Sequence, residues 1–253
     1  IATMCSNLIV CLYYAWVLTH ALRQKDTRAG LSFSVHQGLP EGESIRSVFS
    51  VGIPASVATL LFDLDYVVID RLATGYGDIP LAAIGIVLKA ERLPLNTGVG
   101  LCQGMMPLAA YNYAAGNGKR MNDAVRTSRL YGLIMAAVSI LLYELFAPQI
   151  LGFFIADPET IAIGADFLRV RCLATPFMFM CFHLVNLFQA VGQGPTALRL
   201  AVVRWAVFNI PMLFLFNHLF GMYGIVWTQM VADMCVATIS LSVYAGFLKK
   251  HSI

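Results

Sequence analysis

The chain has 253 residues, of which 58% are hydrophobic and only 12% are charged, and its formal net charge is +3. Soluble domains lie nearer to half apolar and a quarter charged. Together with a mean hydropathy of +0.72, these values disfavour a soluble helical core and predict an all-α, polytopic membrane protein. Apolar runs of about 20 residues, the length that spans a ~30 Å hydrocarbon core, recur along the chain.

Apolar runs and helix breakers predict about seven transmembrane helices. They cover residues 1–22, 47–73, 79–113, 128–148, 159–191, 196–219 and 222–248. The first run has neither an initiator Met nor a signal-peptide cleavage pattern, so we expect the chain to start inside a helix of a longer protein. The third and fifth spans exceed 30 residues and contain Pro94 and Pro176, which predict bending.

The connections carry recognisable signals. Asp157-Pro158-Glu159 is typical of a helix start, with Asp as N-cap and Pro at the first helical position. Gly116-Asn117-Gly118 is typical of a helix end followed by a turn. Residues 23–46 are polar and contain glycines, which predicts a surface linker between two helical bundles.

Lysine and arginine are distributed unevenly between the two sets of loops and flanks. One set carries eleven of them, whereas the opposite set, at 74–78, 149–158 and 220–221, is flanked only by Arg71. Because basic residues mark the cytoplasmic side, we expect the first set and the C-terminus to be cytoplasmic. The eleven are Arg23, Lys25, Arg28, Arg46, Lys119, Arg120, Arg126, Arg129, Arg199, Lys249 and Lys250.

Ionisable residues at membrane depth are costly and need a reason. From the 1.5 Å rise per residue, Asp63, Glu91 and Arg169 lie roughly 15–18 Å inside three different spans. They predict a self-neutralising ion-pair layer whose other members are Asp65, Lys89, Arg92 and Arg171. The layer either fixes helix packing or contains an acid, Asp63 or Glu91, that binds a proton or cation during transport.

Polar, methionine and aromatic side chains of the third and fifth spans are candidates for lining a substrate cavity, although the same residue types are ordinary core filler. These candidates are Asn96, Gln103, Met106, Phe177, Met180 and His183. The six cysteines lie in apolar spans without a CxxC pair, so we expect neither a metal site nor disulfides. Enzyme and ATP-binding motifs are absent from the sequence, and we expect no enzymatic activity, no cofactor and no nucleic-acid partner.

Several stretches together carry a resemblance to a known family. GIP at 52–54, LAAIGI at 81–86 and GVGLCQGMMPLAAYNYAAGNGKR at 98–120 are followed in order by FLRVR, FQAVGQG and GMYGIVWTQMVAD, at 167–171, 188–194 and 221–233. This order resembles the second half of MATE (multidrug and toxic compound extrusion) transporters. The stretch at 98–120 is the most specific part of the resemblance.

The resemblance implies a protein of two six-helix bundles in a bacterial plasma membrane. Residues 1–22 would be the last helix of an absent N-terminal lobe, 23–46 a cytoplasmic interlobe linker and 47–253 the C-terminal lobe. Such a protein exchanges sodium or protons for organic cations, so its partners are these substrates, the bilayer and the missing lobe. By position, Asp63 and Glu91 resemble acids that members carry on the first two helices of this lobe.

Two alternatives stay open at this point. A lipid-linked oligosaccharide flippase of the same superfamily would have a more basic central cavity, because its cargo is anionic. A non-transporting remnant would be a naturally short chain. One departure concerns the fifth helix of the lobe, where sodium-coupled relatives carry an Asp but residues 179–183 contain none.

Overall fold

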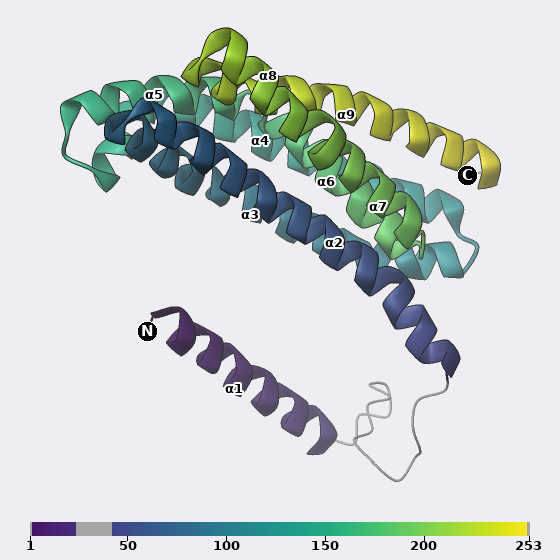
Figure 1. The fold of residues 1–253 in the computed structure, drawn as a ribbon. Coiled ribbons are helices and arrows are strands. Elements are labelled where there is room, and N and C mark those ends of the chain that lie inside the picture. Colours follow the sequence, from purple (N-terminus) through teal and green to yellow (C-terminus); the bar gives the residue numbers. More distant parts are fainter. Residues whose placement is uncertain (1, 24–41, 252–253) are drawn as a thin grey trace. The chain divides into compact units, whose positions relative to one another are not determined.

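A computed structural model describes residues 2–23 and 42–251 (Figure 1). Throughout these residues the secondary structure is helical, without a strand, as the sequence predicts. The chain divides into two compact units, Ile1–Ile45 and Arg46–Ile253. The fold is therefore all-α in the described part of both units.

The first unit contains one helix, α1 (Ala2–Arg23), whose side chains from Met4 to Trp16 are exposed. The interlobe linker expected at 23–46 lies mostly outside the described residues, which omit 24–41. The next helix, α2, begins at Gly42, so its first residues lie within the last part of the expected linker.

The second unit is a bundle of helices that run alongside one another (Figure 1). Its elements match the order of the six spans expected after residue 46. They are α2 (Gly42–Ala73), η2 (Thr74–Tyr76), α3 (Asp78–Ala114), α4 (Gly118–Phe154), α5 (Pro158–Cys172), α6 (Thr175–Ala190), α7 (Gly194–Val202), a π-helical segment η3 (Val203–Asn209), α8 (Ile210–Phe220) and α9 (Met222–His251).

Proline has different consequences in the two longest expected spans. The fifth span is broken between α5 and α6, just before Pro176, and the two helices are bent by 49°. In contrast, α3 continues as one helix through Pro94 and Pro107. A proline at position 94 cannot donate to the carbonyl of Ala90, and the hydroxyl of Tyr143 donates to that carbonyl instead, at 2.7 Å. This substitute bond explains how α3 stays helical.

The predicted helix ends at 116–118 and at 157 are confirmed. After α3, Gly116 adopts φ 71°, and the amide of Asn117 donates to the carbonyl of Asn112 at 2.8 Å. Gly192 adopts φ 74° after α6, and the amide of Gln193 donates to Phe188 in the same way. These are Schellman turns, and the left-handed conformation at their centre favours glycine.

At the start of α5, a carboxylate oxygen of Asp157 accepts hydrogen bonds from the Thr160 amide at 2.9 Å and from its hydroxyl at 2.6 Å. These two bonds hold the pKa of Asp157 below its usual value. Asp157 is therefore the N-cap that the sequence predicts.

Three apolar clusters follow one another along the bundle. One joins the end of α2 and the start of α3 to α5 and the start of α9. A second joins the end of α3 and the start of α4 to α7 and the end of α9. The third lies around Phe179 and Met180 on α6 and Val236 on α9. The helices thus share an apolar interior, and several charged side chains are buried within it.

Length and composition qualify four helices in the described residues for crossing a membrane, or five if α5 and α6 form one broken span. The four are Val48–Tyr76, Gly118–Phe154, Gly194–Phe220 and Met222–Lys250. The count is lower than the seven spans expected, because the apolar part of α1 is short and α3 carries Lys89, Glu91 and Arg92 in its first half. The fold is that of a polytopic membrane protein.

Two hydrogen bonds join helix ends that are distant in sequence. The hydroxyl of Tyr76, in the turn after α2, donates to Asn217 near the end of α8 at 2.6 Å. The hydroxyl of Tyr244, late in α9, donates to Asn122 early in α4 at 2.9 Å. The first bond lies near two connections that are poor in Lys and Arg, and the second lies near two chain segments that are rich in them. This agrees with successive spans that run in alternating directions.

Candidate functional site

The interior of the bundle contains an ion pair between α3 and α5. Nε and Nη2 of Arg171 donate to the two carboxylate oxygens of Glu91, at 2.8 and 2.9 Å. Both side chains are buried. The predicted layer therefore does bring an acid of the third span against a base of the fifth. Bidentate geometry makes such a pair strong and fixes its orientation.

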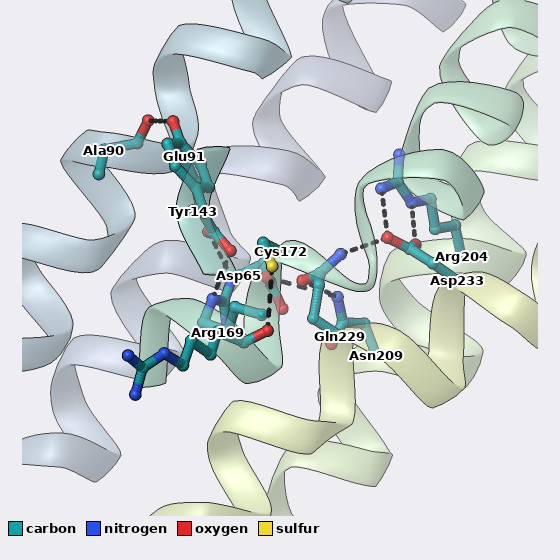
Figure 2. A network of polar contacts seen from close by, with 11 residues as sticks. Asp65, Ala90, Glu91, Tyr143, Arg169, Cys172, Arg204, Asn209, Gln229 and Asp233 are labelled. Atoms are coloured by element: carbon teal, nitrogen blue, oxygen red, sulfur yellow. Dashed lines mark hydrogen bonds and ion pairs between the residues drawn. The ribbon is translucent and has the colours of Figure 1, made fainter. Parts of the chain in front are cut away.

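A second buried ion pair joins the π-helical segment to α9. Nε and Nη2 of Arg204 donate to the carboxylate of Asp233 at 2.7 and 3.0 Å (Figure 2). The Gln229 amide, one turn earlier on α9, donates to Asp233 at 2.6 Å and accepts from Asn209 at 3.2 Å. The wider π turn allows side chains five residues apart, Arg204 and Asn209, to meet two side chains four residues apart on α9.

Asp65 on α2 lies at the end of this network. It is 1% exposed, and one of its oxygens accepts a long hydrogen bond of 3.5 Å from Asn209. Its other oxygen is buried without a hydrogen-bond partner among the described residues, and no Lys, Arg or His nitrogen of that part lies within 4.0 Å of it. Asp65 was predicted as a member of the ion-pair layer, and the structure instead gives it a neutral amide partner.

Asp65, Glu91 and Arg171 line one small cavity of about 10 Å³, together with Gln229 and apolar neighbours. That volume is enough for about one water molecule. Besides the free oxygen of Asp65, Nη1 of Arg171 is buried without a partner among the described residues. A small polar ligand in this cavity would have both an acceptor and a donor to bind.

A larger cavity of about 230 Å³ lies between α2, α3, α6 and the π-helical segment. It shares Phe62 and Trp205 with the small cavity, so these two rings separate the two spaces. Arg204 and Gln103 also line it. Among the described residues, no group of three His, Cys, Asp or Glu side chains is placed to hold a metal ion.

The other residues of the predicted layer lie outside this network. Asp63 is exposed, and within the described part of the chain it makes no ion pair or side-chain hydrogen bond. Lys89 and Arg92 are exposed, and the Arg92 guanidinium lies 5.4 Å from the Tyr66 ring. Arg169 is half-exposed and lies near Glu144 and Asp166, at 4.0 and 3.6 Å.

Of the six predicted substrate-cavity residues, Gln103 alone lines the 230 Å³ cavity. Asn96 is exposed and Met106 half-buried. The other three, Phe177, Met180 and His183, belong to the packed interior: Met180 and Phe177 join the cluster around Phe179, and the buried His183 ring lies 5.5 Å from Phe179. For these three, the structure favours core packing over a role as cavity lining.

Sequence reasoning missed Arg204 and Asn209 altogether. It likewise did not assign Gln229 and Asp233 to the ion-pair layer. The available signal was Arg204, a lone arginine in the middle of an apolar span. Such a residue predicts an acid on a facing helix, because an unpaired charge at membrane depth is costly. The neighbour could not be identified because the π turn changes the helical register at this point.

The chain is similar to known proteins in sequence and in fold. The sequence model of the MatE family matches residues 54–215. The multidrug export protein MepA of Staphylococcus aureus strain MSSA476 is 27% identical over 246 residues, covering 96% of this chain and 52% of the relative. MepA of Staphylococcus saprophyticus is 28% identical over 245 residues, with the same coverage. The chain thus spans about half the length of these curated relatives.

Solved structures show the same fold. The Vibrio cholerae MATE transporter VcmN in its bent form superposes with a TM-score of 0.85 at 18% identity, over 95% of this chain and 55% of that one. An outward-facing multidrug resistance MATE transporter of the MOP superfamily superposes with a TM-score of 0.82 at 16% identity, over 88% and 50% of the two chains. At these identities the similarity concerns the fold alone.

Proposed function

The chain belongs to the MatE family, and from this premise we propose that it forms one lobe of a secondary active multidrug efflux transporter. In this proposal, protons or sodium ions move inward while organic cations move outward. The names of the relatives support export of multiple drugs, and the coverage of about half supports a second lobe of the same protein as the principal partner. The protein would then act by transport rather than by enzymatic catalysis.

The observation that carries the proposal is the environment of Asp65. A buried carboxylate is costly unless it is paired, protonated or bound to a cation. Glu91 has its arginine, whereas Asp65, which lines the small cavity, has one long bond to an amide and one oxygen without a partner among the described residues. In the proposal, Asp65 takes up the proton or sodium ion, and the Glu91–Arg171 pair holds the surrounding helices in place.

The earlier candidates, Asp63 and Glu91, enter the proposal with different roles. Asp63 is exposed, so it could face the second lobe and bind a cation there. Glu91 could exchange its arginine for a cation only if the bidentate pair opened, which makes it the weaker candidate.

The test is gradient-driven efflux of ethidium, a fluorescent organic cation, from vesicles that contain the whole protein. With either a pH or a sodium gradient imposed as the driving force, we expect Asp65→Asn to abolish the transport of ethidium against its own concentration gradient. Asp70→Asn, an exposed acid on the same helix, is the matched control and should keep the wild-type rate. Wild-type rates and unchanged ion dependence in Asp65→Asn, Asp63→Asn and Glu91→Gln would rule out coupling in this lobe.

We also propose that the protein resides in a bacterial plasma membrane with its C-terminus in the cytoplasm. The eleven basic residues of one set of loops and flanks support this orientation. The flippase alternative gains no support, because Arg204, the charged residue of the 230 Å³ cavity, is already neutralised by Asp233.

A further inference from the structure

The 230 Å³ cavity has a lining that the coupling proposal does not use. Its polar groups converge from four elements, and three aromatic rings form part of its wall. The polar side chains are Thr59, Gln103, Asn186, Gln189 and Arg204, and the rings are those of Phe62, Phe182 and Trp205.

The aromatic wall is preorganised. The Phe62 ring meets Phe182 edge-on at 5.9 Å and Trp205 at 5.2 Å. The Arg204 guanidinium lies 4.5 Å from the Phe182 ring and 4.2 Å from the Trp205 ring. A flat aromatic ligand can therefore pack against rings whose positions are already fixed, which lowers the entropy cost of binding.

The charge balance of the cavity disfavours a cation. Among the described residues that line it there is no Asp or Glu, and Arg204 is the one charged side chain. Its partner Asp233 is fully buried and is not part of the lining. Because Arg204 is already neutralised by Asp233, a cation in this cavity would give up its hydration without finding a free carboxylate as counter-ion, whereas an uncharged ligand carries no such cost.

The hydrogen-bond donors of the lining that remain unpaired favour a ligand with a hydrogen-bond acceptor. Nε and Nη2 of Arg204 are bonded to Asp233, and Figure 2 shows the third nitrogen, Nη1, directed away from that acid. The side chains of Gln103 and Gln189 make no hydrogen bond within the described part of the chain. A guanidinium N–H and two amides are thus available to a carbonyl group.

We propose that this cavity binds flat, uncharged aromatic molecules that carry a carbonyl acceptor. The ring packs against Phe62, Phe182 and Trp205, and the carbonyl accepts from Nη1 of Arg204 and from a glutamine amide. The cavity lies below the ~300 Å³ at which drug-sized sites begin, which suits a ligand of a few fused rings. The inference rests on the proposed function only in treating this lobe as one that binds transported molecules.

The test compares two ligands with the same tricyclic ring, acridone and proflavine, on the purified whole protein in detergent without any gradient. Acridone is uncharged and carries a carbonyl, whereas proflavine is a cation. Quenching of tryptophan fluorescence reports binding, and we expect acridone to bind about 10-fold tighter or more. Trp205→Phe, which keeps an aromatic ring, should remove most of the quenching signal.

Gln103→Leu should weaken acridone binding about 3- to 10-fold, which corresponds to the loss of one hydrogen bond. Asn96→Leu is the matched control: it replaces an exposed amide of the same helix outside the lining and should leave the affinity unchanged. Tighter binding of proflavine, or equal losses in the two leucine variants, would overturn the proposal. Since no gradient is applied, either result leaves the ethidium efflux test unaffected.

Discussion

At the scale of single residues, the Glu91–Arg171 pair is expected to be costly to break. Arg171→Met leaves the Glu91 carboxylate buried without its two donors, so we expect the free energy of unfolding to fall by about 3–5 kcal/mol. Unfolding in detergent with increasing dodecyl sulfate measures this loss. The double variant Arg171→Met with Glu91→Leu should recover much of it, because neither charge is then left unpaired.

The matched control for this prediction is Arg169→Met on the same helix. Its side chain is 39% exposed and lies 4.0 Å from Glu144, so its removal should cost less than about 1 kcal/mol. Equal losses in Arg169→Met and Arg171→Met would show that burial of the ion pair does not determine its contribution.

The start of α5 gives a prediction about pH. The folded-state pKa of Asp157 is lowered, so its stabilising contribution is complete above the ordinary value of 3.8 and is lost as the pH falls through the lower folded value. The difference in thermal midpoint between the unmodified protein and Asp157→Asn should stay constant from pH 7 to about pH 4. It should shrink at lower pH, and a difference that already shrinks between pH 7 and 5 would contradict this cap.

How much of the site is predictable differs from residue to residue. Glu91 and Arg171 could be placed in one layer because depth follows directly from the helical rise. Their pairing, and the absence of a basic partner for Asp65, depend on how the helices are rotated about their axes. That rotation is set by packing between helices, which a single apolar sequence with little amphipathic pattern does not encode.

At the scale of helices, Tyr143 and Pro94 form a pair in which one residue compensates for the other. Tyr143→Phe leaves the carbonyl of Ala90 without a donor, so we expect a loss of about 1–3 kcal/mol in unfolding free energy. Pro94→Ala supplies a backbone N–H to the same carbonyl. In the Pro94→Ala background, Tyr143→Phe should therefore cost much less, and a double-mutant cycle measures the difference.

Equal costs of Tyr143→Phe in both backgrounds would show that this bond does not compensate for the proline. The pair also explains why a bend at Pro94 could not be judged from sequence. A proline marks a missing N–H, but whether the helix bends depends on another donor, and here that donor, Tyr143, lies 53 residues along the chain from the Ala90 carbonyl that it bonds. Turn signals such as Gly116 are local, and for that reason the helix ends were predictable.

At the scale of the whole molecule, the proposed orientation can be tested by cysteine labelling. In a background without the six native cysteines, Asp78→Cys and Lys119→Cys place one thiol at the start of α3 and one at the start of α4. A membrane-impermeant maleimide should label Asp78→Cys on intact cells and Lys119→Cys only after permeabilisation. The reverse pattern would invert the proposed topology.

Composition alone was sufficient to predict a membrane protein, since long apolar runs with few charges have almost no soluble alternative. The number of membrane spans was harder to predict from the sequence. α3 is 37 residues long yet carries Lys89, Glu91 and Arg92, so its fit to a membrane depends on neighbours that cover those charges. For Glu91, that neighbour is Arg171.

The bonds from Tyr76 to Asn217 and from Tyr244 to Asn122 have a consequence for the lipid around this lobe. Each bond ties one pair of helices together at one end, α2 with α8 and α4 with α9, and so opposes sliding within that pair. A bilayer of unsuitable thickness must then stretch or thin around the lobe, at a cost of fractions of a kcal/mol per Å of mismatch. The acyl-chain length of the host membrane therefore becomes a condition for the stability of this bundle.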